Sequence, residues 1–255
     1  MILLLQACSG REGEPTPPTL PQAAEKATFT TATGLGPHHM HAEVARTMGG
    51  GATPPQTTSE TLDVRWKDTD HWAVSLGRDG RVRNEMVVWD GIAWSGSGEG
   101  LKRQGDAEPF RVQLAQTWDP WAYALESLAD QLVLSETDSA LVEGRRAQGY
   151  RIAAPPLEGG APESVAPEAA SAEPADPAAT PAPPKKRKAD RPKRGWTVTA
   201  AEGEVWIDES TAVRLKGDVH LTAIAGQRTR EIQLTFVRDG LGVEPEIPVP
   251  SGDKQ

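Results

Sequence analysis

The sequence predicts a mainly β domain of the α+β class, built as a curved antiparallel sheet or half-open β barrel with one covering helix. Three observations predict this class. The first two are short segments in which apolar and polar residues alternate, and turn-forming pairs that separate them. A third is a segment in the middle of the chain whose apolar residues recur at helical spacing. A sheet with one apolar, buried face needs a second layer to cover that face, and we expect the helix to supply it.

Turn signals divide the alternating part of the chain into a meander. Asp68-Thr69-Asp70 favours a turn, and Asp79-Gly80 and Asp90-Gly91 are pairs typical of two-residue hairpins. We expect roughly nine or ten strands in the sheet. The clearest strands cover residues 62–66, 72–76, 83–89, 92–94, 204–208, 213–224 and 231–237.

One helix is predicted between these two groups of strands. Asp119 is placed to cap it and Pro120 occupies its first position, which are both preferences of helix starts. The apolar residues at helical spacing are Trp118, Trp121, Ala122, Leu125, Leu128, Ala129 and Leu132. Such a stripe is suited to cover the dry face of the sheet.

Residues 155–194 are rich in proline and alanine and carry acidic residues followed by basic ones. This composition cannot bury enough apolar surface to offset its chain entropy, so we expect disorder. Strand-like sequences flank the segment at residues 150–152 and 195–198, which indicates an insertion in one hairpin loop. A single β domain therefore spans residues 28–245, followed by a tail over 246–255.

The N-terminal sequence Leu5-Gln6-Ala7-Cys8 resembles the bacterial lipobox. In that class of protein the chain is cleaved before the cysteine, so the resemblance implies a lipid on Cys8 and a membrane anchor. Residues 1–8 are then part of a lipoprotein signal peptide, with a shorter apolar run than usual. Residues 9–27, polar and proline-bearing, are typical of a flexible tether. Ser9 after the cysteine favours the periplasmic face of the outer membrane of the bacterial cell envelope.

The layout of the chain resembles the LolA, LolB and LppX superfamily of envelope lipoproteins, because one mid-chain helix interrupts antiparallel strands behind a lipobox and a tether. The resemblance covers about residues 38–154 and 195–245. Members are half-open β barrels with a helical lid, and several hold acyl chains between sheet and lid. The resemblance implies a ligand site at the dry-face and helix positions Val64, Trp66, Trp72, Val74, Met86, Trp121, Leu125 and Leu128.

The same apolar residues are also what an ordinary solid core contains. Two functions therefore stay open. The first is a lipoprotein that binds a hydrophobic ligand, an acyl chain or lipid, in lipid or lipoprotein trafficking. The alternative is a non-enzymatic envelope scaffold with a solid core, which binds a protein partner through the insertion or the solvated face of the sheet.

Other classes of function are disfavoured. The net charge of −9 with scattered acidic residues lacks the basic field that nucleic acid requires. The sequence has no nucleophile elbow and no metalloprotease motif, so we expect no enzyme and no cofactor. His39 and His41 share one face of a strand, but a metal site needs a third or fourth ligand. We expect no metal there and interpret these histidines as solvated residues of an edge strand.

Overall fold

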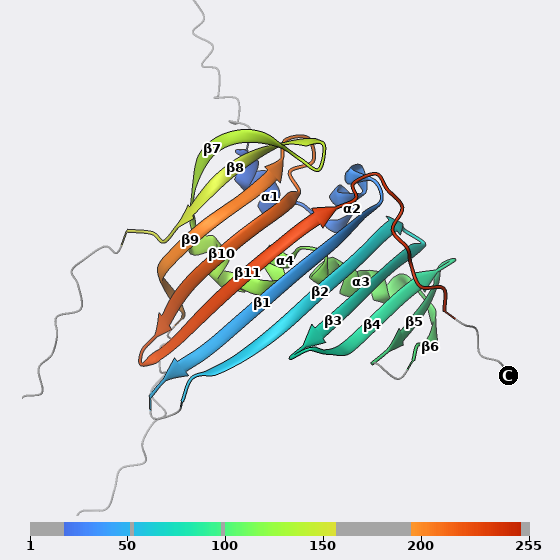
Figure 1. Cartoon of the computed structure of the whole chain (residues 1–255), viewed down its shortest axis with the longest axis horizontal. Helices are drawn as coiled ribbons and strands as arrows, with labels where there is room; N and C mark the ends of the chain where they lie inside the picture. Colours follow the sequence, from blue (N-terminus) through green and yellow to red (C-terminus); the bar gives the residue numbers. More distant parts are fainter. Residues whose placement is uncertain (1–17, 52–53, 98–99, 157–194, 251–255) are drawn as a thin grey trace, which may run out of the picture.

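The structure is a computed structural model that describes residues 18–51, 54–97, 100–156 and 195–250. The described chain forms one open antiparallel sheet of 11 strands in the order β6-β5-β4-β3-β2-β1-β11-β10-β9-β8-β7 (Figure 1). The strands are β1 (His38–Gly50), β2 (Gln56–Asp68), β3 (His71–Arg78), β4 (Arg81–Trp89), β5 (Ile92–Gly96), β6 (Lys102–Asp106), β7 (Val133–Val142), β8 (Arg145–Ala153), β9 (Thr197–Asp208), β10 (Arg214–Ala225) and β11 (Arg228–Asp239). The predicted fold class is confirmed, with more strands than expected.

The helical cover is more divided than the sequence indicated. Its elements are α1 (Leu20–Glu25), α2 (Phe29–Ala32), the 3-10 turn η1 (Thr33–Leu35), α3 (Glu108–Thr117), α4 (Pro120–Leu125) and the 3-10 segment η2 (Glu126–Gln131). In Figure 1, α3 and α4 cross one face of the sheet, which we call the inner face. The prediction of a single helix from Asp119 to Leu132 was wrong, because Glu126 adopts a φ of 51° directly after Leu125 and the α-helix ends there.

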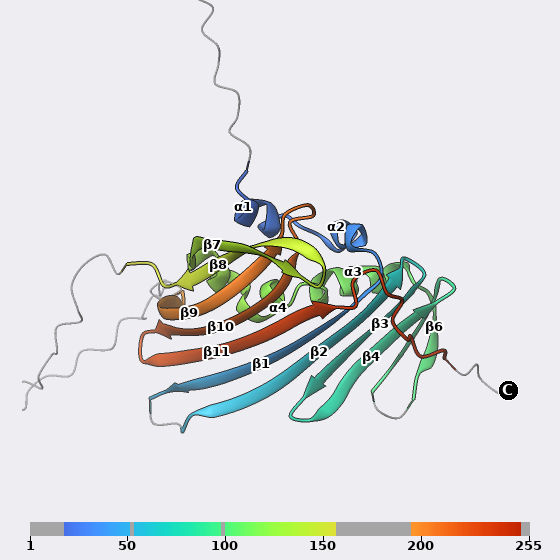
Figure 2. The same ribbon diagram turned by 45° about the horizontal axis from the view of Figure 1, so that its top comes forward.

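The curvature of the sheet is visible in Figure 2, which turns the molecule by 45°. The inner face of the sheet and the helices share one large apolar core. Alternate side chains of the central strands, such as Val64 in β2 and Leu234 in β11, point into it, and these two are at most 2% exposed. None of the helices in the described ranges is long and apolar enough to cross a membrane.

The opposite, outer face carries a second and smaller apolar cluster. Ala73, Val87 and Trp94 of three neighbouring strands form one cluster with Ile247, which is only 7% exposed. The segment after β11 therefore packs across this face, as the red trace in Figure 1 shows. Ile247, expected in the tail over 246–255, is instead part of this packed cluster.

The N-terminal boundary of the packed region also differs from the prediction. Residues 20–25, expected within the flexible tether over 9–27, form α1, and Ala24 is buried in the main core. The apolar side of this short helix gains burial that a free tether would not have. The lipobox with Cys8 and residues 157–194 of the expected insertion lie outside the described residues.

Strand β1 lies in the middle of the sheet, between β2 and β11. His39 is opposite Arg65 of β2 and Asp239 of β11, so strands from the two ends of the chain are neighbours. The interpretation of His39 and His41 as edge-strand residues was wrong. Both histidines lie on the outer face, and His38 turns to the inner face, where it is 2% exposed.

Candidate ligand site between the sheet and the helices

All eight side chains proposed as ligand-binding residues lie together in the main core. Five come from the inner face of three adjacent strands and three from the helical cover, and none is more than 5% exposed. They are Val64, Trp66, Trp72, Val74, Met86, Trp121, Leu125 and Leu128. The strand residues are brought together by register, since Trp66 is opposite Trp72 and Val74 is opposite both Val64 and Met86.

The interface that these residues form is closely packed. One small cavity lies between the sheet and the helices, against Phe29, Val64, Trp66 and Trp118, with a volume of about 10 Å³. A cavity needs roughly 10–15 Å³ of such volume to hold one water molecule. The side chains of the sheet and the helices therefore fill this part of the interface.

A larger open groove lies at the end of the cover where η2 leads into β7. Its volume is about 400 Å³, within the range of roughly 300–1,000 Å³ typical of small-molecule sites. It is lined by Thr19, Pro21, Gln22, Glu25, Trp121, Ala129, Asp130, Leu132 and Leu134. Trp121 is the one predicted ligand residue that reaches this groove, and through it the groove adjoins the core.

Arg214 joins α4 to the inner face of the sheet. Its guanidinium donates to the carboxylate of Asp119 at 2.9 Å and also pairs with Glu25 of α1. Its Cζ atom lies 5.0 Å from the ring centroid of Trp121, a cation–π contact. Asp119 in turn accepts a hydrogen bond from the backbone N–H of Trp121 at 3.2 Å, so one carboxylate caps the helix and pairs with the arginine.

Arg238 makes a second polar attachment beneath the helices. It is 1% exposed, donates from Nε to the carbonyl of Arg214 at 3.0 Å, and donates from its Nη2 to the carbonyl of Trp118. Burial in this apolar surrounding lowers its pKa to about 10. The neighbouring His38 is also buried, and desolvation, with the positive charge of Arg238, lowers the pKa of His38 to about 4.

A third attachment holds the C-terminal end of α4. Arg46 of β1 pairs with the buried Glu60 of β2 and donates to the carbonyl of Tyr123 at 3.2 Å. Arg78 also donates to Glu60, from Nε at 3.1 Å. Burial opposes ionisation of Glu60, but the hydrogen bond from Arg78 and the charge of Arg46 outweigh it, so the pKa of Glu60 is lowered. Both ends of α4 are thus fixed to the sheet by charged groups.

These charged residues of the interface were missed by the sequence analysis, although a signal existed. Arg238 continues the inward-facing series of Ile232, Leu234 and Phe236, at spacings of two residues. Arg46 continues the series of Met40, Ala42 and Val44 in the same way. A charged residue in phase with a buried apolar series points into the core and needs a partner there.

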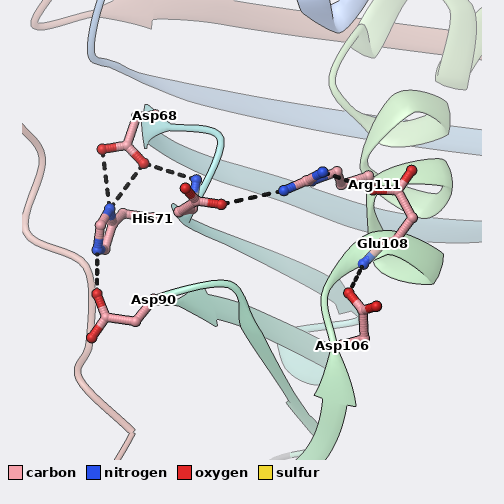
Figure 3. A network of polar contacts seen from close by, with 7 residues as sticks. Asp68, His71, Asp90, Asp106, Glu108 and Arg111 are labelled. Atoms are coloured by element: carbon pink, nitrogen blue, oxygen red, sulfur yellow. Dashed lines mark hydrogen bonds and ion pairs between the residues drawn. The ribbon is translucent and has the colours of Figure 1, made fainter.

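A separate polar network ties α3 to the hairpin turns at one end of the sheet (Figure 3). His71 contacts Asp68 from Nδ1 at 2.9 Å and Asp90 from Nε2 at 3.0 Å. Arg111 of α3 pairs with Glu108 at 2.7 Å and with Asp70 at 3.2 Å. The network connects the β2–β3 turn and the β4–β5 turn with the helical cover.

A metal site is not present in the part of the chain that the structure describes, since no three His, Cys, Asp or Glu side chains are placed to share an ion. The histidines of β1 are engaged differently. His39 contacts Asp63 from Nε2 at 2.7 Å and Asp239 from Nδ1 at 3.1 Å. The hydrogen bond with Asp63, against a smaller cost of burial, raises the pKa of His39.

Comparison with known proteins gives structural likenesses alone. No family model and no curated protein matches the chain. The chain is similar to LprF from Mycobacterium bovis, with 14% identity, a TM-score of 0.33, and coverage of 94% of this chain and 100% of that one. It is similar to a LolA superfamily protein from Nitrosomonas europaea, with 8% identity, a TM-score of 0.25, and coverage of 91% and 96%. It is also similar to the lipoprotein LppX from Mycobacterium tuberculosis, with 12% identity, a TM-score of 0.27, and coverage of 83% and 91%.

Proposed function

We propose that this chain is a non-enzymatic cell-envelope lipoprotein that binds an apolar ligand, an acyl chain or lipid, in lipid or lipoprotein trafficking. A lipid on Cys8 anchors it to the periplasmic face of the outer membrane. The ligand enters at the groove beside Trp121 and extends between the inner face of the sheet and the helices.

The observation that carries this proposal is the continuity between the open groove and the apolar core. Leu132 and Leu134 line the groove and pack against the main core, and Trp121 belongs to both. An apolar chain that starts in the groove would meet apolar side chains along its path, and burying it removes that surface from water. Because the interface behind Trp121 is packed, deeper entry requires the helices to move away from the sheet.

The test is native mass spectrometry of the full chain purified from a bacterial host, compared with the same sample after denaturation. We expect excess mass that is lost on denaturation and is recovered as lipid in an organic extract. A preparation that carries the mass of the chain alone, and that also fails to bind a neutral fluorescent probe such as N-phenyl-1-naphthylamine, would contradict ligand binding.

The alternative is an envelope scaffold with a solid core, and the small cavity of about 10 Å³ beside Trp66 and Trp118 favours it. In that case the protein partner binds the insertion or the outer face of the sheet. Deleting residues 157–194 would then remove the partner from cross-linked envelope preparations. An unchanged set of cross-linked proteins, together with bound lipid in the mass spectrum, would decide for the first proposal.

A further inference from the structure

We infer that the outer face of the sheet carries a binding site for an extended, proline-containing peptide of a protein partner. In this structure the chain's own residues 243–250, which we call the strap, occupy that site. The inference goes beyond the proposed function, because it concerns the face opposite the helical cover and needs no lipid ligand.

The floor of the site is one row of apolar residues across three neighbouring strands. Register places Ala73 of β3 opposite Val87 of β4, and Val87 opposite Trp94 of β5. Residues directly opposite each other in adjacent strands point to the same face, so these side chains form a continuous strip that spans roughly 10 Å. The partly buried residues packed against the strip are Trp89, Ile92 and Leu101.

The strap lies on this strip in the way that a bound peptide does. Ile247 is 7% exposed and belongs to the same cluster as the strip. Among the described residues, no backbone–backbone hydrogen bond involves residues 244–250. The strap is therefore held to the sheet by contacts of side chains, and a separate peptide can reproduce all of them.

The sequence of the strap suits an extended conformation. Pro245, Pro248 and Pro250 have a fixed φ and no backbone N–H, so they cannot donate to a strand ladder. Peptides of this kind are extended before they bind, and they dock on aromatic, apolar surfaces. At about 3.1 Å per residue, three residues of such a peptide span the strip, which contains Trp94.

Two cations of β2 fix the direction of the peptide. Lys67 pairs with Glu244 at 2.8 Å, and Arg65 donates to the carbonyl of Glu246 at 3.3 Å. Arg65 is opposite Ala73, so the acidic part of the strap lies at the β2 end of the strip and Ile247 follows it. The site thus selects a carboxylate three residues before a branched apolar side chain.

The strap is joined to the end of β11 through a linker that can swing. Gly240 and Gly242 have φ values of 59° and 82°, and a Cβ atom added at either position would meet nothing within 4 Å. One backbone hydrogen bond, from Gly242 to the carbonyl of Pro37 at 2.7 Å, attaches the linker to another part of the chain. The partner's peptide displaces the strap by bending the chain at this linker.

The experiment measures the fluorescence anisotropy of a labelled peptide with the sequence of residues 243–250, titrated with the full chain. Ile247→Asp in the chain places a carboxylate in the cluster, so its own strap leaves the strip. We expect this variant to bind the peptide at a concentration about 10-fold or more lower than the wild type, because the attached strap of the wild type competes. Val249→Asp, at a side chain that is 64% exposed, is the matched control and should bind as the wild type does.

Changes in the peptide test the site without any risk to the fold of the chain. The peptide with Ile247→Ser should not bind the Ile247→Asp chain. The wild-type chain should show the same preference for the original peptide at higher concentration, so the test does not depend on the variant chain. Lys67→Glu in the Ile247→Asp chain should weaken the original peptide by about 2- to 5-fold, and the peptide with Glu244→Lys should recover this loss.

Two results would overturn the inference. The first is that both chains bind the original and the Ile247→Ser peptides equally, or bind neither. The second is that the wild-type chain elutes as a dimer in size-exclusion chromatography and Ile247→Asp converts it to a monomer, because the occupant would then be a second copy of this chain. Lipid found on the same chain by native mass spectrometry would leave the proposed function standing in either case.

Discussion

Arg214 in β10 and Asp119 at the start of α4 form a buried ion pair of 2.9 Å that fixes the helical cover to the sheet. The two side chains are 3% and 10% exposed. Removing one member of such a pair leaves an uncompensated charge in the interior, which is far more costly than removing both. This relationship gives a direct test of how α4 is held.

We expect Arg214→Met to lower the free energy of unfolding by about 3–5 kcal/mol, because Asp119 would remain buried without its partner. Urea unfolding followed by circular dichroism measures the change. The control is Lys216→Met, since Lys216 is 43% exposed and its contact with Glu204 is long, at 3.9 Å. A double variant with Arg214→Met and Asp119→Asn should recover part of the lost free energy of unfolding. If the double variant is as unstable as Arg214→Met alone, the ion pair does not account for the loss.

Leu125→Ala should lower the free energy of unfolding by about 2–5 kcal/mol, because it removes a side chain from a packed interface. Leu125 is 0% exposed and lies between α4 and the sheet. Leu141→Ala is the control, since that side chain is 76% exposed and its loss should change stability by less than about 0.5 kcal/mol. Equal effects of the two substitutions in urea unfolding would refute a packed interface at Leu125.

His38 should make the protein less stable as the pH falls from about 6.5 to about 4. Its pKa is lowered to about 4 in the folded chain, so between these values the unfolded chain binds the proton and the folded chain does not. The stability that depends on neutral His38 is fully present above the ordinary histidine pKa of about 6.5 and is lost as the pH falls toward about 4. Thermal unfolding of the wild type and of His38→Gln at several pH values measures this, and the variant should show a flatter profile over this range.

His39 should have the opposite dependence, because its pKa is raised by the contacts with Asp63 and Asp239. Its contribution is present below the ordinary histidine pKa and is lost as the pH rises through the raised value. The wild type should therefore lose stability as the pH rises through the raised pKa of His39, and the His39→Asn variant should lack this loss. His220→Asn, on an exposed side chain, is the control, and an identical pH profile for wild type and His39→Asn would contradict the prediction.

Ile247→Ala should destabilise the protein by about 2 kcal/mol, because Ile247 is buried in one cluster with Ala73, Val87 and Trp94. Val249→Ala changes a side chain that is 64% exposed and serves as the control. Limited proteolysis after the substitution should cut the segment after β11 before the sheet unfolds. If the segment stays as resistant as in the wild type, its packing does not depend on Ile247.

The sequence predicted the hairpins of the first half because each depends on local signals. The Asp79-Gly80 and Asp90-Gly91 turns lie between β3, β4 and β5 as expected, since turn residues and alternation are read within a few positions. Helix α3 escaped prediction because Leu114 and Thr117 are its only buried residues, too few for a periodic stripe. The position of β1 could not be predicted, because its pairing with β11 joins residues about 200 positions apart.

Part of the candidate site could also be predicted, because it too depends on local sequence patterns. Alternation in β2, β3 and β4 is sufficient to assign Val64, Val74 and Met86 to one face, and the structure brings them together. Whether side chains fill the space above this face depends on how closely the helices approach the sheet. The alternation of apolar and polar residues carries no information on that distance. The groove beside Trp121 needs α1, η2 and β7 together, and α1 was predicted to be part of a tether.

The pairing of β1 with β11 also determines the order in which this molecule can be completed. A chain made from its N-terminus presents the free edge of β1 long before β11 exists, so the central pair of strands forms last. Contacts between distant parts of a chain slow folding, and an open strand edge in a partly made sheet favours aggregation. The two halves of the sheet can therefore join only after β11 has been made, late in the synthesis of the chain.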